Sequence, residues 1–200
     1  ILGLAMAKAE FRAGAAAVPI SPLPEHLEGR LYLGGYDGYL GRPARGVHDD
    51  LYARAFALTH GDDTVALVVL DLVGMANSHI ARIRRAAARR LGVPEGSVLV
   101  ACTHTHAGPD LQGLWGGVSP EYARFLRRQA VEALVRAAAG ARKVSLRAAS
   151  VPLPGRTVNR RGWPGTDETF PVLQARDGRR RPIAPIVNLA AHPTVTQEEH

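Results

Sequence analysis

The sequence predicts an α/β domain in which a mixed β-sheet is layered with helices and hairpins lie at both ends. In the middle of the 200-residue chain, apolar runs typical of strands alternate with helical stretches, a pattern that favours layers of helix on sheet. Toward each end, two strand-like runs flank a short turn, "GDD" or "GRRR", which indicates a hairpin. No repeat or domain boundary is visible, so residues 1–200 are expected to form one unit.

The first half of the chain predicts three strands. "FRAGAAAVPIS" (11–21) is the first, and it leads into a glycine- and proline-rich stretch, 22–50, that is too long for a plain connection. Residues 51–60 and 64–72 form the first hairpin. The second of these runs is almost continuously apolar, so we expect it to be buried on both faces.

A helix and a further strand follow. The helix is expected over 77–92, with Asn77 or Ser78 as its N-cap and Gly92 at its end. "SVLVACTHT" (97–105) is expected to be the next buried strand.

The second half predicts a longer helix and a second hairpin. "SPEYARFLRRQAVEALVRAAAG" (119–140) begins with a serine cap and a proline at the first helical position. A strand is expected over 143–153. Residues 171–177 and 182–192 are expected to pair as a hairpin whose second arm is buried.

Composition excludes several classes of protein. With 46% hydrophobic and 22% charged residues the chain is typical of a globular domain, and one cysteine excludes an internal disulfide framework. The formal net charge is +7, and many arginines lie in two clusters, 82–90 and 176–182. We interpret both as solvated surface, with an anionic membrane surface as the alternative. No nucleic-acid partner is expected, because no binding motif or interleaved aromatic residue accompanies the clusters. Residues 1–7 fit the tail of a signal peptide or a frayed lead.

Two histidines end the strand expected at 97–105, in "ACTHTHAGPD". If this segment is extended, Cys102, His104 and His106 share one face. Imidazole is the commonest metal-binding side chain, and sites are often built where strands open into loops. We therefore favour a metal or catalytic role for the pair over two buried structural histidines.

His192 ends a second apolar run, "PIVNLAAHPTV" (185–195). If the strands that lead to His104 and His192 are parallel neighbours, the two histidines meet over one ion. Catalytic zinc sites use about three protein ligands and keep one position open. No third ligand is evident from the sequence.

Other polar residues receive plainer interpretations. Asp71 either orients a histidine or caps the turn after its strand, and the sequence leaves both open. Asp110 is expected to be a solvated loop residue, and Cys102 a small buried strand residue. The remaining histidines in polar or loop settings are expected at the surface: His26, His60 and His79.

A series of short motifs runs along the chain: "AGAAAVPISP" (13–22), "GGYDG" (34–38), "GVHDDLYARAFAL" (46–58), "VVLDLVG" (68–74), "ACTHTHAGP" (101–109), "NRR" (159–161) and "NLAAHPTV" (188–195). In this order and rough spacing the chain resembles the neutral (non-lysosomal) ceramidase family over essentially its whole length. The most specific motifs are "THTHAGP" and "GVHDDLYARA". The resemblance implies a zinc amidohydrolase that cleaves the N-acyl bond of ceramide into sphingosine and a fatty acid.

The same resemblance implies roles for individual residues. His104 and His192 would be zinc ligands, with His106 beside the metal. His48 would line the pocket, and Arg160 would reach the reacting region, where a guanidinium can hold an oxyanion or a carboxylate product. The family's other ligands, a Glu and a Tyr, lie beyond a segment of this kind. Residues 1–200 are therefore expected to be the N-terminal portion of a ceramidase-like catalytic domain, incomplete at the C-terminus and inactive if the rest is required.

The expected function is a zinc-dependent amidohydrolase acting on ceramide or a related N-acyl lipid, with Zn²⁺ as cofactor. One alternative is a metallohydrolase of another N-acyl or ester substrate. The other is a non-catalytic metal-binding or membrane-surface module, which needs both arginine clusters on one face. The sequence decides neither oligomeric state nor compartment: the family resemblance favours secretion or membrane association, and a cytoplasmic location stays open.

Overall fold

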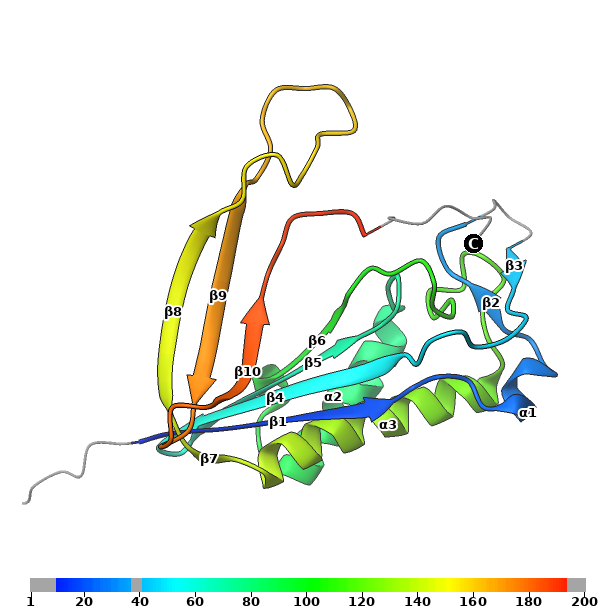
Figure 1. Ribbon diagram of the computed structural model, residues 1–200. Coiled ribbons are helices and arrows are strands. Elements are labelled where there is room, and N and C mark those ends of the chain that lie inside the picture. Colours follow the sequence, from blue (N-terminus) through cyan, green and yellow to red (C-terminus); the bar gives the residue numbers. More distant parts are fainter. Residues whose placement is uncertain (1–9, 37–40, 194–200) are drawn as a thin grey trace, which may run out of the picture.

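The computed structural model describes residues 10–36 and 41–193, so the opening residues interpreted as a leader or a frayed end lie outside the described residues (Figure 1). The main layer is a five-stranded sheet in the order β6-β5-β4-β1-β7. β5 and β6 are parallel and the other neighbours antiparallel, so the sheet is mixed and the predicted α/β class is confirmed. Its strands are β1 Phe11–Pro19, β4 Tyr52–His60, β5 Asp63–Leu70, β6 Val98–Cys102 and β7 Arg142–Lys143.

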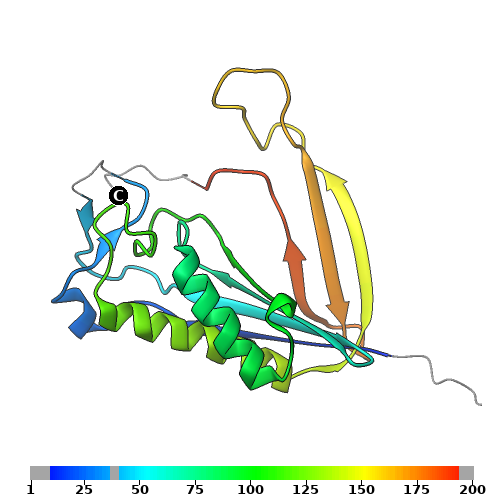
Figure 2. The same ribbon diagram turned by 180° about the vertical axis from the view of Figure 1, so that it is seen from behind.

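Helices cover one face of this sheet and a second sheet faces the other (Figures 1 and 2). The covering helices are α2, Asn77–Leu91, and α3, Pro120–Ala139. The second sheet has the order β10-β9-β8, built from β8 Ser145–Pro152, β9 Thr169–Arg176 and β10 Pro182–Val187. The remaining elements are α1 Pro24–Leu27, β2 Tyr32–Leu33, β3 Arg42–Pro43 and a short 3₁₀ helix, Glu95–Ser97.

The larger core lies between the five-stranded sheet and the two helices. Its fully buried side chains include Leu70 of β5, Ile83 of α2 and Leu126 of α3. A smaller core joins the two sheets, where Phe56 and Ala13 pack with Ala175. Burying these side chains on both faces of the sheet supplies the main driving force for folding.

Helix ends follow local rules with one exception. Ser119 caps α3 by accepting a hydrogen bond from the backbone N–H of Tyr122 at 3.2 Å, and Gly92 ends α2 with a left-handed φ of 69°. Both were expected. The predicted cap of α2 is wrong: the helix begins at Asn77, and its N-cap residue, Ala76, forms no side-chain cap.

Two strands are shorter than the sequence predicts. β6 ends at Cys102 instead of Thr105, so the face-sharing argument for His104 and His106 does not apply. β10 ends at Val187, is largely exposed or half-buried, and pairs with β9 in a different sheet from β6. The expectation of a buried strand parallel to β6 is therefore wrong.

His26 is buried, although it was expected at the surface. Its ring packs edge-on against Tyr122 of α3, with the centroids 5.3 Å apart, and its Nδ1 accepts a hydrogen bond from the backbone N–H of Leu23 at 3.0 Å. α1 thereby fastens the glycine-rich stretch to the body of the domain. Within the described residues no helix is long and apolar enough to cross a bilayer.

Gly14 allows β1 to approach the end of α3 closely. A Cβ at this position would lie 2.1 Å from the carbonyl oxygen of Ala137, which is backbone and has little freedom to move. We therefore expect Gly14→Ala to lower the free energy of unfolding by about 3 kcal/mol in urea denaturation, because overpacking strains the strand–helix contact. Gly178→Ala is the matched control, since a Cβ there meets nothing within 4 Å. Equal stability of the two variants would contradict this account of the contact.

Candidate metal centre

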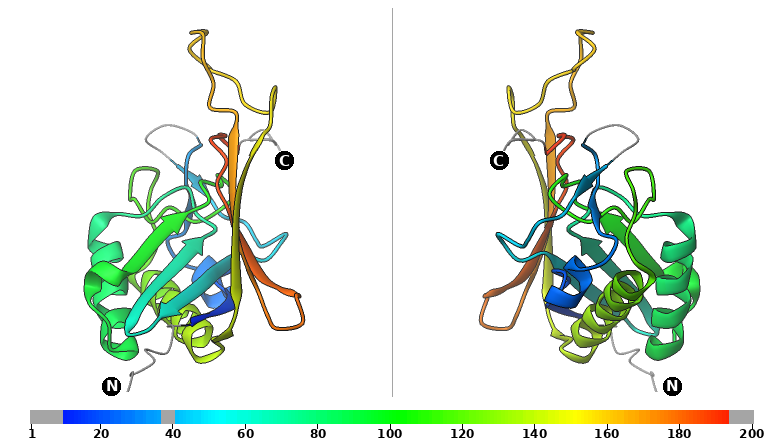
Figure 3. Two further views of the ribbon diagram at one scale, coloured as in Figure 1. Left: turned by 90° about the vertical axis from the view of Figure 1, so that its left-hand side faces the viewer. Right: turned by 90° about the vertical axis from the view of Figure 1, so that its right-hand side faces the viewer.

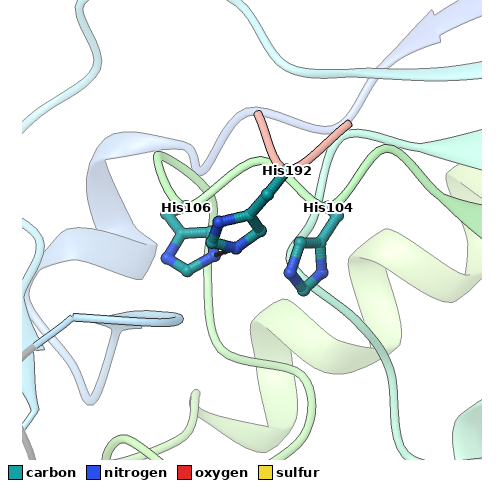
Figure 4. A group of neighbouring side chains, drawn as sticks. All are labelled: His104, His106 and His192. Atoms are coloured by element: carbon teal, nitrogen blue, oxygen red, sulfur yellow. Dashed lines mark hydrogen bonds between the residues drawn. The ribbon is translucent and has the colours of Figure 1, made fainter. Parts of the chain in front are cut away.

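Three histidines meet beside the carboxyl end of β6 (Figure 4). His104 and His106 come from the loop that follows β6, and His192 comes from the segment after β10. One ring nitrogen of each lies within 4.8 Å of the others, and the ring centroids are 4.9 to 5.1 Å apart. His104 and His192 thus come together as expected, but from two different sheets, and His106 supplies the third imidazole that the sequence did not identify as a ligand.

His104 is fixed at both its backbone and its ring. Its backbone N–H donates to the carbonyl of Leu72 at 2.9 Å, and its Nδ1 lies 2.6 Å from the carbonyl of Val73. Because a carbonyl only accepts, Nδ1 carries the proton and Nε2 keeps its lone pair, as in many metal-binding histidines. His104 also has a φ of 66°, a left-handed value that is rare outside glycine and is often found at functional sites.

The glycine-rich stretch holds His106. The ring is buried, and Tyr36 packs against it edge-on at 5.1 Å between centroids. Gly35 has a φ of 98°, and a Cβ there would lie 2.1 Å from Nδ1 of His106. Only glycine fits this position, so Gly35 and Tyr36 form part of the wall behind His106.

Both ring nitrogens of His192 form hydrogen bonds, one with Arg160 and one with His106. The Arg160 guanidinium donates to Nδ1 at 3.1 Å, and Nε2 lies 3.0 Å from Nε2 of His106. Since Arg160 can only donate, Nδ1 accepts, and the proton of neutral His192 lies on Nε2, facing His106. An ion on Nδ1 displaces Arg160. An ion on Nε2 displaces His106 and moves the ring proton to Nδ1, where Arg160 can no longer donate, so Arg160 loses this hydrogen bond in either case.

The electrostatics favour neutral imidazoles. The pKa of His106 lies below its ordinary value, first because burial disfavours the charged ring and then because His104, His192 and Arg160 lie close by. The pKa of His192 is lowered by desolvation, His104 and Arg160. Neutral histidine is the form that binds metal, so these shifts fit a metal site. The three histidines could hold a metal ion, and His104 and His192 are the two exposed members of the group.

The histidine loop is held by Asp110, which was expected to be solvated. Its side chain is 1% exposed, and its two carboxylate oxygens accept hydrogen bonds of 2.7 to 3.0 Å from backbone N–H groups. The donors are Gln112, Gly113, Trp115 and Gly117. The backbone N–H of Asp110 donates in turn to the carbonyl of Tyr32 at 2.8 Å. The carboxylate therefore folds the loop on itself, and the backbone N–H fastens the loop to β2. These contacts explain why Asp110 is buried.

Asp71 does not orient a histidine among the described residues. Its Oδ2 accepts the backbone N–H of Tyr52 at 2.9 Å and pairs with the Arg54 guanidinium. Asp71 thus joins the end of β5 to the start of β4. The structure therefore shows neither of the two roles that the sequence left open: these partners of the carboxylate lie on the neighbouring strand, not on a histidine or in the turn after β5.

His48 lies apart from the three histidines. Its side chain is 96% exposed and bonds Asp49 at 2.9 Å. Its place in the pocket of the whole protein stays a prediction. Arg160, in contrast, reaches the three histidines from the connection between β8 and β9 and lines a cavity of about 610 Å³ with Asn159, His104 and His192.

Cys102 is half-buried, and burial raises the pKa of its thiol to about 11, which suits a structural cysteine.

The arrangement of the chain is similar to that of two solved ceramidase structures. A ceramidase complexed with C2 superposes with a TM-score of 0.74 at 23% identity, over 90% of this chain and 31% of that chain. A neutral ceramidase from Pseudomonas aeruginosa superposes with a TM-score of 0.73 at 22% identity, over 90% of this chain and 32% of that chain. The chain has the fold of the neutral ceramidases. It spans about a third of their length. No protein-family model and no curated protein matches it.

The Asp110 carboxylate gives a direct test of how the histidine loop is held. Asp110→Asn replaces one oxygen by an NH₂ group, which turns a donor toward two backbone N–H groups. We expect the free energy of unfolding to fall by about 3 kcal/mol in chemical denaturation, since buried donors lose a charged acceptor. Asp62→Asn, in an exposed turn, is expected to change it by less than about 0.5 kcal/mol. If the two variants were equally stable, Asp110 would not hold the loop.

Proposed function

We propose that the chain is the histidine-bearing part of a zinc-dependent hydrolase that cleaves the N-acyl amide bond of ceramide or a related N-acyl lipid. The observation that carries the proposal is the meeting of His104, His106 and His192 on a ceramidase fold. The sequence motifs that resemble the neutral ceramidases supply these same histidines. The proposal concerns the whole protein, because the chain spans about a third of the two ceramidases.

His104 and His192 are the proposed zinc ligands. His104 presents Nε2 because Val73 holds its Nδ1, and His192 is neutral and exposed beside it. Uncharged nitrogen donors and an open side suit zinc. When bound, zinc can polarise an amide carbonyl and activate water.

His106 and Arg160 are the proposed catalytic residues. His106 is buried and neutral, with its Nε2 turned toward His192, so it can accept a proton at that atom and return it to the departing amine. Arg160 lies at the cavity wall, where its guanidinium can hold the developing oxyanion or the carboxylate of the released fatty acid. His48 is proposed to join the pocket in the complete domain.

The substrate is proposed to be an N-acyl lipid. One of the similar structures is a ceramidase complexed with C2. That complex belongs to the other protein, and the shared fold supports the same substrate class for this chain. A metallohydrolase of another N-acyl or ester substrate would use the same residues and differs only in the substrate that is cleaved.

The non-catalytic module has less support. It needs the arginine clusters 82–90 and 176–182 on one face. The first lies on α2, on the helix side of the main sheet, and the second forms the turn between β9 and β10, on the opposite side of the molecule (Figure 3). The two clusters therefore do not form a common basic surface.

Zinc affinity and hydrolysis test these roles separately. We expect His104→Ala and His192→Ala each to weaken zinc binding by about 100-fold or more in competition titrations, since each removes a ligand. His60→Ala, an exposed histidine stacked on Phe11, is the control and should leave zinc affinity unchanged. His106→Ala should keep zinc affinity within about tenfold and lower amide hydrolysis by about 100-fold or more.

Two results would overturn the proposal. Unchanged zinc affinity in both ligand variants would exclude the metal site. Zinc-loaded full-length protein that cleaves esters but no N-acyl amide would exclude the amidase and favour the second substrate class.

A further inference from the structure

The connection between β8 and β9, residues 153–168, projects from the body of the molecule (Figures 1 and 3). Its base is closed by a hydrogen bond from the backbone N–H of Leu153 to the carbonyl of Glu168 at 2.8 Å. Arg160 reaches back from this loop to His192, so the loop also forms part of the cavity wall at the metal centre. Whatever the projecting end contacts is therefore brought close to that cavity.

Large apolar side chains are exposed on this loop. Val158 is 81% exposed and Trp163 is 65% exposed. Leu189, which lines the same cavity from the segment after β10, is 39% exposed. Single exposed apolar residues are common on protein surfaces. Here a tryptophan and a valine share one projecting loop next to the cavity that Leu189 lines, and this combination favours a contact surface.

Arginines outnumber acidic residues on this loop. Arg156, Arg160 and Arg161 are exposed, Arg160 reaches back to His192, and the Arg161 guanidinium lies 5.6 Å from the centre of the Trp163 ring. The acidic residues lie at the base and are engaged locally: Asp167 accepts hydrogen bonds from Thr169, and Glu168 accepts one from the backbone of Gly155. Tryptophan with aliphatic and arginine neighbours is the combination found at the boundary between lipid and water.

The most arginine-rich surface of the described residues lies elsewhere. A groove of about 960 Å³ between α2 and α3 is lined by seven arginines, among them Arg82, Arg89 and Arg128. No aromatic residue lines it, and it lies on the helix side of the main sheet (Figure 2). Charge without an apolar anchor is typical of a solvated helix face, so this groove does not compete with the loop as a lipid contact.

We propose that residues 153–168 form a membrane-contact loop, which places Trp163 and Val158 at the surface of an anionic membrane. Arg156 and Arg161 then face lipid phosphates, and a lipid drawn from the membrane enters the cavity that Arg160 and His192 line. This inference rests on the proposed function, because membrane contact is useful to an enzyme whose N-acyl lipid substrate stays in a bilayer. Binding of the loop to the membrane is measurable without any catalysis.

The chain has two tryptophans, which makes the loop directly observable. Trp115→Phe leaves Trp163 as the sole tryptophan of the 200 residues, and vesicles of phosphatidylcholine with phosphatidylglycerol are then added to this purified 200-residue protein. We expect the emission of Trp163 to shift to shorter wavelength and to be quenched by brominated acyl chains. In the matched variant Trp163→Phe, the remaining Trp115 is expected to show neither change.

A pair of double variants tests the charge. Arg156→Gln with Arg161→Gln removes two charges from the loop and is expected to weaken vesicle binding by about tenfold or more. Arg179→Gln with Arg180→Gln removes two charges from the turn between β9 and β10 and is expected to leave binding within about twofold. Neither pair includes a residue assigned to the metal centre.

Several results would overturn the membrane-contact loop. These are an unchanged emission of Trp163 with anionic vesicles, an equal loss of binding in both double variants, and equal binding to vesicles of phosphatidylcholine alone. Trp163 emission that is already at short wavelength before vesicles are added would show that another part of the protein covers the loop, and would also exclude the proposal. Trp163 insertion in a protein that hydrolyses no N-acyl amide would support the loop while excluding the proposed function.

Discussion

A buried carboxylate keeps its charge only when hydrogen bonds replace the water it has lost, and at Asp110 the backbone of the next seven residues supplies them. The same residue bonds the carbonyl of Tyr32 through its own N–H, so the loop closes on itself and is fastened to β2. With both ends fixed, His104 can hold its left-handed φ and His106 can press against Gly35. The loop that carries His104 and His106 thus continues into a segment that Asp110 folds and fastens to β2.

The centre also depends on two sheets meeting. His104 and His106 lie at the end of the parallel pair β5 and β6, where open α/β sheets commonly carry their sites. His192 and Arg160 come from segments flanking the second sheet, which packs on the first through Phe56 and Ala175. Any change that loosens this small core therefore separates His192 from its partners, even though the packing lies away from the metal centre.

The sequence predicts what local rules determine. Apolar periodicity and the Ser119 cap place α3, and the turn "GDD" places the hairpin of β4 and β5, because these signals act within a few residues. The meeting of His104 and His192 was expected for a wrong reason, since β10 is no neighbour of β6. The buried states of Asp110 and His26 could not be predicted, because their partners are backbone groups and rings whose positions depend on the tertiary fold. The third imidazole, His106, was visible in "HTH", but its closeness to His192 depends on the packing of two sheets.

The central proposal is that His104 and His192 bind one zinc ion beside His106, and anomalous diffraction at the zinc edge tests it most directly. Crystals of the protein grown with zinc should show one strong anomalous peak between the three rings, about 2 Å from a nitrogen of His104 and of His192. A peak at another group of side chains, or none near these histidines in crystals that contain zinc, would contradict the account.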